Sequence, residues 1–336
     1  MKAFAIQNKF GLDSLTLIER PDLAPGYGQV LIKLRAVSLN YRDLMVVKGL
    51  YNPKLPLPRI PFSDGVGEVV AVGEGVTEVK TGDRVAGIFF QKWLCGELTE
   101  TKAQSALGGA IDGLLTQYAV LHEDGVVSVP EHLTDEEGAA LPCAAVTAWN
   151  ALVTSGGVKA GDTVLVQGTG GVSIFALQFA KLLGARVIAT SSSDEKLESV
   201  RQLGASDTIN YKQTPEWGKR VQELTQDIGV DYVVEVGGAG TLNQSLRAVR
   251  HGGQISLIGV LSGGSGEINT ASILRKNVRV QGIYVGSREM FEAMNKAIAL
   301  HKLRPVIDRV FEFSEAPQAL KYMESGAHFG KICIRF

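Results

Sequence analysis

The stretch Thr163-Val-Leu-Val-Gln-Gly-Thr-Gly-Gly-Val-Ser173 decides the fold of this 336-residue chain. Its first five residues, Thr163–Gln167, form a short, apolar and β-branched run, which predicts a buried strand. A turn with three glycines follows, and the apolar pattern of Val172–Leu183 predicts a helix that ends at Gly184. A glycine-rich turn between a strand and a helix is typical of a site for the diphosphate of a dinucleotide.

The residues of this turn suit the backbone geometry of such a site. Gly168 permits the tight turn, while Gly170 and Gly171 let the backbone approach a diphosphate. The helix that starts at Val172 presents free N–H groups and the positive end of its dipole, and the small Ser173 lets the helix pack against the strand. A strand-to-helix turn without a ligand is the alternative. The further β/α repeats that follow favour the dinucleotide site.

Beyond the glycine turn the chain alternates between short strands and helices. The further predicted strands are Arg186–Thr190, Asp231–Val236, Gln254–Gly259 and Val278–Val285. The further predicted helices are Asp194–Leu203, one that begins at Thr214-Pro215-Glu216 and one that ends at Val249. This alternation predicts an α/β fold with a doubly wound parallel sheet of Rossmann type, covered by helices on both faces.

The two ends of the chain have a different pattern. From Met1 to about Val129 apolar residues alternate with period two in short runs separated by glycine turns, which predicts a barrel-like β module. A β-rich pattern returns after Ser287. We therefore predict that an α/β domain, residues 124–286, is inserted in a β-barrel domain built from residues 1–123 and 287–336. Within the latter, residues 91–112 are predicted to be irregular.

Composition narrows the classes of partner and compartment. The chain has 34 Lys and Arg against 35 Asp and Glu, and its net charge of −1 argues against nucleic acid or a membrane surface as a partner. Its three cysteines contain no Cys-x-x-Cys pair and form no disulfide framework, which favours a reducing compartment. There is no signal-peptide pattern at Met1 and no run of 18 apolar residues, so we expect a cytoplasmic protein.

The residues after the second strand of the α/β region indicate which nucleotide is bound. A site that prefers NAD(H) places an acid roughly 20 residues beyond the first glycine, and this chain has none there. Ser191, Ser192 and Lys196 instead supply hydroxyls and a cation that suit a 2′-phosphate, so we predict NADP(H) over NAD(H). Two alternatives stay open. In the first, Ser193 only caps the next helix and Lys196 is solvated; in the second, Asp194 turns toward the ribose.

With these residues, the chain resembles the medium-chain dehydrogenase/reductase superfamily, in particular its zinc-independent quinone oxidoreductase-like and alcohol dehydrogenase-like members. The resemblance covers nearly the whole length. Its motifs are Val30-Leu-Ile-Lys33, Ser38-Leu-Asn-Tyr-Arg-Asp43, Pro61 with Gly65-Val-Gly-Glu-Val-Val70, Gly82-Asp-Arg-Val85, Leu141-Pro-Cys-Ala-Ala-Val-Thr-Ala-Trp149, the Gly168 turn, Ile209-Asn-Tyr211 and Gly330-Lys331. The resemblance implies a GroES-like β domain beside a Rossmann domain, an active site in the cleft between them, and commonly a homodimer through the sheet edge at Val278–Val285.

The resemblance also bears on zinc. Zinc-dependent members place a Cys where this chain has Asn40-Tyr41, a His-Glu pair where it has Ser63-Asp64, and a second Cys where it has Cys143. A catalytic zinc needs three protein ligands, and Cys143 is the only good one left, so we expect no zinc. The lobe of four close cysteines that holds a structural zinc is also missing, since Cys95 stands alone.

The resemblance implies that Asn40, Asp43 and Tyr51 line the catalytic cleft. We expect Asn40 to bind the substrate oxygen or the nicotinamide ribose, Tyr51 to donate to a carbonyl, and Asp43 to organise the loop or relay a proton. Arg42 stays ambiguous between function and an ordinary surface position. On the cofactor side the resemblance adds Thr147, Tyr211, Val236, Gly237, Gly259, Val260 and Lys331. The rule that ligands lie beyond the carboxyl ends of parallel strands independently selects four of these residues. They are Val236 and Gly237, at the end of Asp231–Val236, and Gly259 and Val260, at the end of Gln254–Gly259.

The predicted function is a zinc-independent, NADPH-dependent oxidoreductase that transfers hydride to a quinone or an α,β-unsaturated carbonyl. An alternative in the same class is an NAD(P)-dependent alcohol dehydrogenase or carbonyl reductase. An alternative of another class is an NADPH-binding structural or regulatory protein with little turnover. The glycine turn is compatible with all three, so the side chains around Asn40, Asp43 and Tyr51 discriminate between them.

Overall fold

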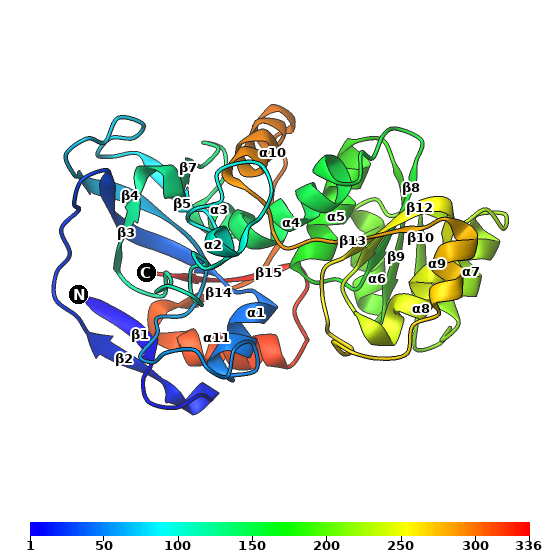
Figure 1. Cartoon of the computed structure of the whole chain (residues 1–336), viewed down its shortest axis with the longest axis horizontal. Coiled ribbons are helices and arrows are strands. Elements are labelled where there is room, and N and C mark those ends of the chain that lie inside the picture. The colour runs from blue at the N-terminus through cyan, green and yellow to red at the C-terminus, as the bar shows by residue number, and fades with distance from the viewer. The chain divides into compact units, whose positions relative to one another are not determined.

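The computed structural model describes all residues from 1 to 336, and they form two compact units (Figure 1). The second unit, Thr147–Val285, is one continuous segment. The first unit is built from both ends of the chain, Met1–Val146 and Gly286–Phe336. None of the helices combines the length and the apolarity needed to cross a bilayer.

The second unit is built on a six-stranded parallel sheet with the order β10-β9-β8-β11-β12-β13. The strand order reverses between β8 and β11, as in a doubly wound fold, and this confirms the predicted fold class. The elements are α4 (Val146–Trp149), β8 (Thr163–Gln167), α5 (Gly171–Leu182), β9 (Arg186–Ser191), α6 (Asp194–Gln202), β10 (Asp207–Asn210), α7 (Trp217–Leu224), β11 (Val230–Glu235), α8 (Ala239–Ala248), β12 (Val249–Leu257), α9 (Thr270–Lys276) and β13 (Arg279–Gly282).

Burial on both faces explains why the strands of this sheet are apolar throughout. Val164, Leu165 and Val166 of β8 are each at most 1% exposed. On one face α7, α8 and α9 pack side by side over a core that includes Leu165. The helix α5 packs on β8 and β9. The buried ring of Phe179 in α5 contacts the ring of Trp149 edge to face. The β-branched run of the sequence therefore marks a central strand.

One predicted helix in this unit begins later than expected, and two elements, the strand β10 and the helix α9, were not predicted. The helix predicted to begin at Thr214-Pro215-Glu216 starts later, at Trp217, because the chain forms turns after Asn210 whose carbonyl accepts from the N–H groups of Gln213 and Thr214. The helix α9 was not predicted, since its seven residues include no fully buried side chain and hence no clear apolar stripe. Capping of α9 by Asn269 was the available signal.

The first unit contains a seven-stranded sheet in the order β14-β15-β3-β4-β5-β7, with β6 also paired to β3, and a separate hairpin of β1 and β2. All pairs are antiparallel except β14 with β15. The elements are β1 (Lys2–Ile6), β2 (Leu15–Glu19), β3 (Gln29–Ser38), α1 (Tyr41–Val47), β4 (Asp64–Val72), β5 (Arg84–Gly87), α2 (Glu100–Ala103), β6 (Tyr118–His122), β7 (Val126–Ser128), α3 (Asp135–Ala139), α10 (Arg288–His301), β14 (Ile307–Glu312), α11 (Ala316–Glu324) and β15 (Lys331–Arg335).

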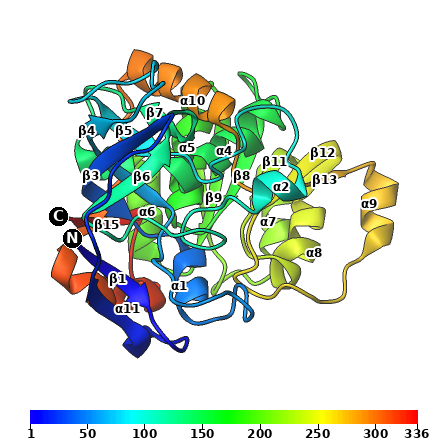
Figure 2. The same ribbon diagram turned by 60° about the vertical axis from the view of Figure 1, so that its left-hand side comes forward.

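The long strand β3 organises this unit, because β4, β6 and β15 all pair with it (Figure 2). Register shifts between β3 and β4 at Leu31/Ile32 and Leu34/Ala36 mark bulges, which bend a strand. Gly67 is required beside one of them, since a Cβ there would stand 2.3 Å from the Lys33 carbonyl oxygen. The segment 91–112 contains only the short helix α2, as expected of an irregular stretch.

The border between the units lies at Val146, whereas the predicted border lay at residue 124. Residues up to Val146 belong to the first unit because β7 pairs with β5 and α3 packs on β3 and β4. The apolar pattern of residues 124–146 does not show which strands they contact, because those strands are distant in the sequence.

Candidate active site

The residues predicted for catalysis begin at the start of α1, not on a loop. Asn40 is the N-cap of α1, and its main-chain N–H donates to Asp43 Oδ2 at 2.8 Å. An Asn followed three residues later by an acid is a capping pattern, which was the missed signal for this helix. The cap fixes the backbone that carries Asn40 and Asp43.

Asp43 is fully buried and holds the ambiguous Arg42 in place. The Arg42 Nη1 atom lies 3.2 Å from Asp43 Oδ1 and donates to the Leu107 carbonyl at 2.8 Å, so it ties α1 to the irregular segment 91–112. Its guanidinium lies over the rings of Tyr51 and Phe89, at 5.1 and 4.9 Å from their centroids. Arg42 is therefore not a solvated surface residue. Burial raises the pKa of Asp43 from 3.8 to about 6, although Arg42 opposes this.

Tyr51 follows α1, and its N–H donates to the Met45 carbonyl at 3.2 Å. Its side chain is 37% exposed, in contrast to the buried Asn40 and Asp43. The ring face contacts Arg42, as described above. Tyr51 is thus the most exposed member of the predicted catalytic set.

A buried lysine joins this set. Lys331 is 3% exposed, and its Nζ donates to the Leu39 carbonyl and to Asn40 Oδ1, both at 2.6 Å. The Asn40 amide nitrogen faces Ser63 Oγ at 3.5 Å, and this hydroxyl donates to Asp64 Oδ1 at 2.6 Å. We call these four side chains, Lys331, Asn40, Ser63 and Asp64, the Lys331–Asp64 chain. Lys331, which the resemblance gives as a cofactor residue, is therefore buried and contacts Asn40 of the predicted catalytic set.

Strand register brings these residues together. In the sheet, Ser38 at the end of β3 pairs with Asp64 at the start of β4 on one side and with Cys333 of β15 on the other. Asn40 follows β3 directly, and Lys331 begins β15. Three segments far apart in the sequence therefore end at the same place.

Cys143 completes the cluster from the helical segment after α3. Its main-chain N–H donates to Asp64 Oδ2 at 3.0 Å. Burial raises the pKa of the Cys143 thiol, so the sulfur is protonated at neutral pH. Burial also raises the pKa of Asp64, while the Lys331 ammonium and the Ser63 hydroxyl oppose this.

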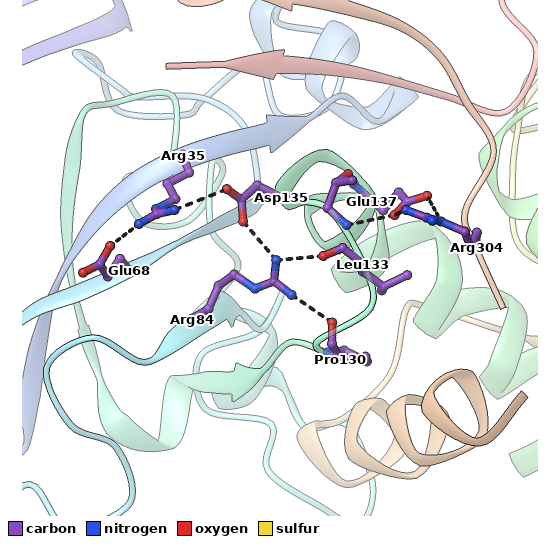
Figure 3. Close-up of polar contacts among 9 residues, drawn as sticks. Arg35, Glu68, Arg84, Pro130, Leu133, Asp135, Glu137 and Arg304 are labelled. Atoms are coloured by element: carbon purple, nitrogen blue, oxygen red, sulfur yellow. Dashed lines mark hydrogen bonds and ion pairs between the residues drawn. The ribbon is translucent and has the colours of Figure 1, made fainter. Parts of the chain in front are cut away.

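Ion pairs anchor the helix α3 that leads to Cys143 (Figure 3). Arg84 donates to the carbonyls of Leu133 and Pro130 at 2.7 and 2.9 Å and lies 3.3 Å from the Asp135 carboxylate at the first turn of α3. Arg304 donates to both oxygens of Glu137 at 2.8 and 2.9 Å. These contacts hold the segment that presents Cys143 to Asp64.

The residues at the zinc-ligand positions do not fit a catalytic zinc. Such a zinc needs three ligands among Cys thiolate, His and carboxylate, plus an open position. Here the set offers one thiol, that of Cys143, and no His, both oxygens of Asp64 accept hydrogen bonds, and the Asn40 oxygen accepts from an ammonium. No three His, Cys, Asp or Glu side chains are grouped so that they could hold a metal ion.

The glycine turn of the second unit fits a dinucleotide diphosphate. Gly168 has φ +71°, which favours glycine, and its N–H donates to the Thr190 carbonyl at 2.8 Å. A Cβ on Gly168 or Gly170 would meet no atom within 4 Å, so open space lies beside both. In α5 the Ile174 N–H donates to the Gly170 carbonyl, and the N–H groups of the three preceding residues, Gly171, Val172 and Ser173, are free for an anion. Ser173 Oγ donates to the Gln167 carbonyl at 2.6 Å and packs the helix onto β8.

The residues proposed for the 2′-phosphate lie at the ends of β9 and β10. The Tyr211 N–H donates to the Ser191 carbonyl at 3.0 Å, which places Tyr211 beside Ser191 and Ser192. Ser193 caps α6, since its Oγ accepts from the Lys196 N–H at 3.3 Å. The Asp194 carboxylate accepts from the side-chain amides of Asn210 and Gln213, at 2.7 and 2.9 Å, so each of its oxygens has a partner in the same unit.

The loops after β11 and β12 contact each other at the same end of the sheet. The N–H groups of Leu261 and Ser262 donate to the carbonyls of Val236 and Gly237, at 3.3 and 2.7 Å. Gly259 is required there, because its Cβ would stand 2.2 Å from the Val236 carbonyl oxygen. Val260 is 49% exposed. The remaining predicted residue of this unit, Thr147, is buried in α4.

Sequence reasoning missed Glu235, the last residue of β11. It is fully buried, yet its carboxylate accepts hydrogen bonds from the loop that follows and from Gln167 at the end of β8. The available signal was an acid at the end of a buried strand, two residues before the glycine pair Gly237-Gly238. Such a group requires donors in the fold.

Comparisons with known proteins agree with this geometry. Residues 26–131 match the family model of the alcohol dehydrogenase GroES-like domain, and residues 171–300 match that of the zinc-binding dehydrogenase. A zinc-type alcohol dehydrogenase-like protein of Schizosaccharomyces pombe is 48% identical over 314 residues, covering 92% of this chain and 91% of that protein. A quinone oxidoreductase of Sus scrofa is 32% identical over 302 residues, with 88% and 85% covered. The solved structure of an NAD-dependent alcohol dehydrogenase, 34% identical, matches with a TM-score of 0.92 over 100% of both chains.

Proposed function

This chain belongs to the medium-chain dehydrogenase/reductase superfamily as an NAD(P)-dependent oxidoreductase of the alcohol dehydrogenase type, and we propose that it interconverts a carbonyl compound and its alcohol with NADP(H) and without zinc. The 48% identical relative with a zinc-type alcohol dehydrogenase-like name supports this substrate class over the quinone or enone first predicted. The proposal that no zinc takes part rests on the Lys331–Asp64 chain, in which the Lys331 ammonium donates a hydrogen bond to the Asn40 side-chain oxygen.

The second unit supplies the nucleotide side of the proposal. The turn of Gly168, Gly170 and Gly171 with the start of α5 would hold the diphosphate, and Ser192 and Lys196 would hold the 2′-phosphate. An NAD(H) site needs an acid that binds the ribose 2′-hydroxyl. Because the Asp194 carboxylate already accepts from the side chains of Asn210 and Gln213, we favour NADP(H) over NAD(H). When bound, the nicotinamide supplies the hydride.

The first unit supplies the groups that polarise the substrate. As hydride adds to the carbonyl carbon, the electron pair of the C=O bond moves to the oxygen, which then needs donors. We assign the phenol of Tyr51 as the group that gives this oxygen its proton and the Asn40 amide nitrogen as a second donor. Solvent can reprotonate Tyr51, because that side chain is partly exposed. Asp43 holds Arg42 against the Tyr51 ring and so positions it.

A second candidate function is reduction of a quinone or an α,β-unsaturated carbonyl. The poor fit of the donor set to zinc and the 32% identity to a quinone oxidoreductase favour it. We further propose a homodimer through β13, which pairs only with β12 and leaves its other edge free.

A screen of NADPH oxidation tests the proposed function. We expect turnover with aldehydes or ketones, and NADPH formation from the matching alcohols, at the same rate with and without a chelator. Tyr51→Phe should lower kcat about a hundredfold with NADPH affinity unchanged, since a proton donor contributes 10²–10⁴-fold. Zinc at one per chain together with loss of activity in chelator would contradict the metal-free mechanism. Turnover of quinones or enones alone would establish the second candidate.

Lys196→Ala tests the choice of nucleotide. Loss of a charge-assisted bond to the 2′-phosphate should raise the Kd of NADPH about tenfold and leave that of NADH unchanged. Lys219→Ala, which removes an exposed lysine on α7, is the control and should change neither. Fluorescence titration of both nucleotides measures the effect. Equal losses for NADPH and NADH in Lys196→Ala would reject the 2′-phosphate role.

A further inference from the structure

Glu235 carries an inference beyond the residues assigned above. Its side chain is fully buried at the end of β11, next to the point between β8 and β11 where the strand order reverses. Dinucleotides bind across the crevice at such a point. Burying a carboxylate costs free energy unless several donors surround it. The donors around Glu235 therefore show which segments of the fold this carboxylate connects.

The two oxygens of Glu235 have different partners. Oε1 accepts from the main-chain N–H groups of Gly237 and Gly238, at 2.8 and 3.0 Å, and from the Thr241 hydroxyl at 2.6 Å. Gly237 and Gly238 belong to the turn between β11 and α8, and Thr241 lies in the first turn of α8. Gly238 has φ +86°, and its own Cβ would stand 2.5 Å from the Gly263 carbonyl oxygen, so this turn is tightly packed. Oε1 therefore fixes the loop after β11.

Oε2 connects that loop to the neighbouring strand. It accepts from Gln167 Nε2 at 2.7 Å and from the Ser245 hydroxyl of α8. Gln167 is the last residue of β8 and directly precedes Gly168, while its carbonyl accepts from Ser173 of α5. One carboxylate thus links the glycine turn after β8 to the loop after β11.

We propose that Glu235 is a positioning residue that sets the two loops in the relative place needed to hold both halves of one dinucleotide. The proposal rests on the nucleotide site described above. The adenosine half is assigned to the ends of β9 and β10, so the loop after β11 is left for the nicotinamide half. Loss of Glu235 should therefore weaken binding of the whole dinucleotide, but not of its adenosine half.

Glu235→Met tests this, because methionine has a similar length and no acceptor. We expect the Kd of NADPH to rise about tenfold, with adenosine 2′,5′-bisphosphate bound as before, since two main-chain donors lose a charged partner. Glu235→Gln keeps one acceptor oxygen for Gly237 and Gly238 and should restore most of the NADPH affinity. Asp162→Met is the matched control: it removes another buried acid, at the opposite end of β8, and should leave both affinities unchanged.

Two further measurements keep the test decisive. Thr241→Val removes one donor without unpairing the carboxylate and should shift NADPH affinity in the same direction, by less. Amide hydrogen exchange at Gly237 and Gly238 should be faster in Glu235→Met even if the protein turns over no substrate, which separates this inference from the proposed function. Unchanged exchange at both glycines, or equal weakening of NADPH and adenosine 2′,5′-bisphosphate, would overturn the positioning role.

Discussion

Lys331→Met should lower the free energy of unfolding by roughly 3–5 kcal/mol, the usual cost of leaving a buried charge without its partner. Burial raises the pKa of Asp64, and the Lys331 ammonium opposes this rise. The same ammonium donates a hydrogen bond to the Asn40 side-chain oxygen. Without it, the Asn40 oxygen has no partner and the amide is free to turn. A misplaced substrate donor should lower kcat about a hundredfold. Urea unfolding and steady-state kinetics measure both effects.

Lys276→Met is the control for this prediction. The Lys276 ammonium donates to the carbonyls of Leu246, Arg247 and Val249, at 2.8–2.9 Å, and has no carboxylate partner. Its loss should therefore cost less stability and no activity. Lys331→Arg keeps the positive charge and should recover part of the stability. A raised Kd for NADPH with unchanged kcat in Lys331→Met would instead place Lys331 at the cofactor, as the family resemblance implies.

Asp43→Asn should change how the stability of the protein depends on pH. The pKa of Asp43 is about 6 in the fold and 3.8 in the unfolded chain, so between these values only the folded state keeps the proton. Stability from this group is therefore lost as pH rises from 4 to above 6, and the difference corresponds to about 3 kcal/mol. Urea unfolding of wild type and Asp43→Asn at pH 4, 5, 6 and 7 measures it.

The comparison between the two proteins isolates Asp43 from other acids. Asp64 is shifted in the same direction, while the pKa values of Glu123 and Glu137 are lowered, and all three remain in both proteins. We expect the wild type to lose stability with rising pH relative to Asp43→Asn. Parallel curves over this range would show that Asp43 is not shifted as described.

The α/β unit was predictable because its signals are local. Thr163–Gln167 is buried on both faces, and this single fact makes the strand apolar throughout and visible in the sequence. The glycine turn was equally visible, since Gly168 must adopt a positive φ and few other residues do so. The start of α7 and the helix α9 were missed where turns and weak burial replace a clear apolar stripe.

The candidate site was predictable only in part. Asn40, Asp43 and Tyr51 came from a family resemblance, and the structure joins Asn40 and Asp43 in one cap. The role of Arg42 was undecided from the sequence, because an arginine just after a strand can be either a functional residue or an ordinary solvent-exposed one. Its contacts with Leu107 and Phe89 come from segments that approach only in the folded unit.

By itself, the amino-acid sequence determined the parallel sheet, its insertion between two β-rich ends, and the nucleotide turn, since each depends on residue periodicity or on backbone freedom within a few positions. Only the tertiary structure decided that Lys331 holds Asn40 and that Glu235 joins β8 to β11. The partners in these contacts lie 291 and 68 residues apart, and no local pattern specifies them. Their chemistry depends on burial, which removes water and makes each charge rely on the donors and acceptors that the fold brings to it.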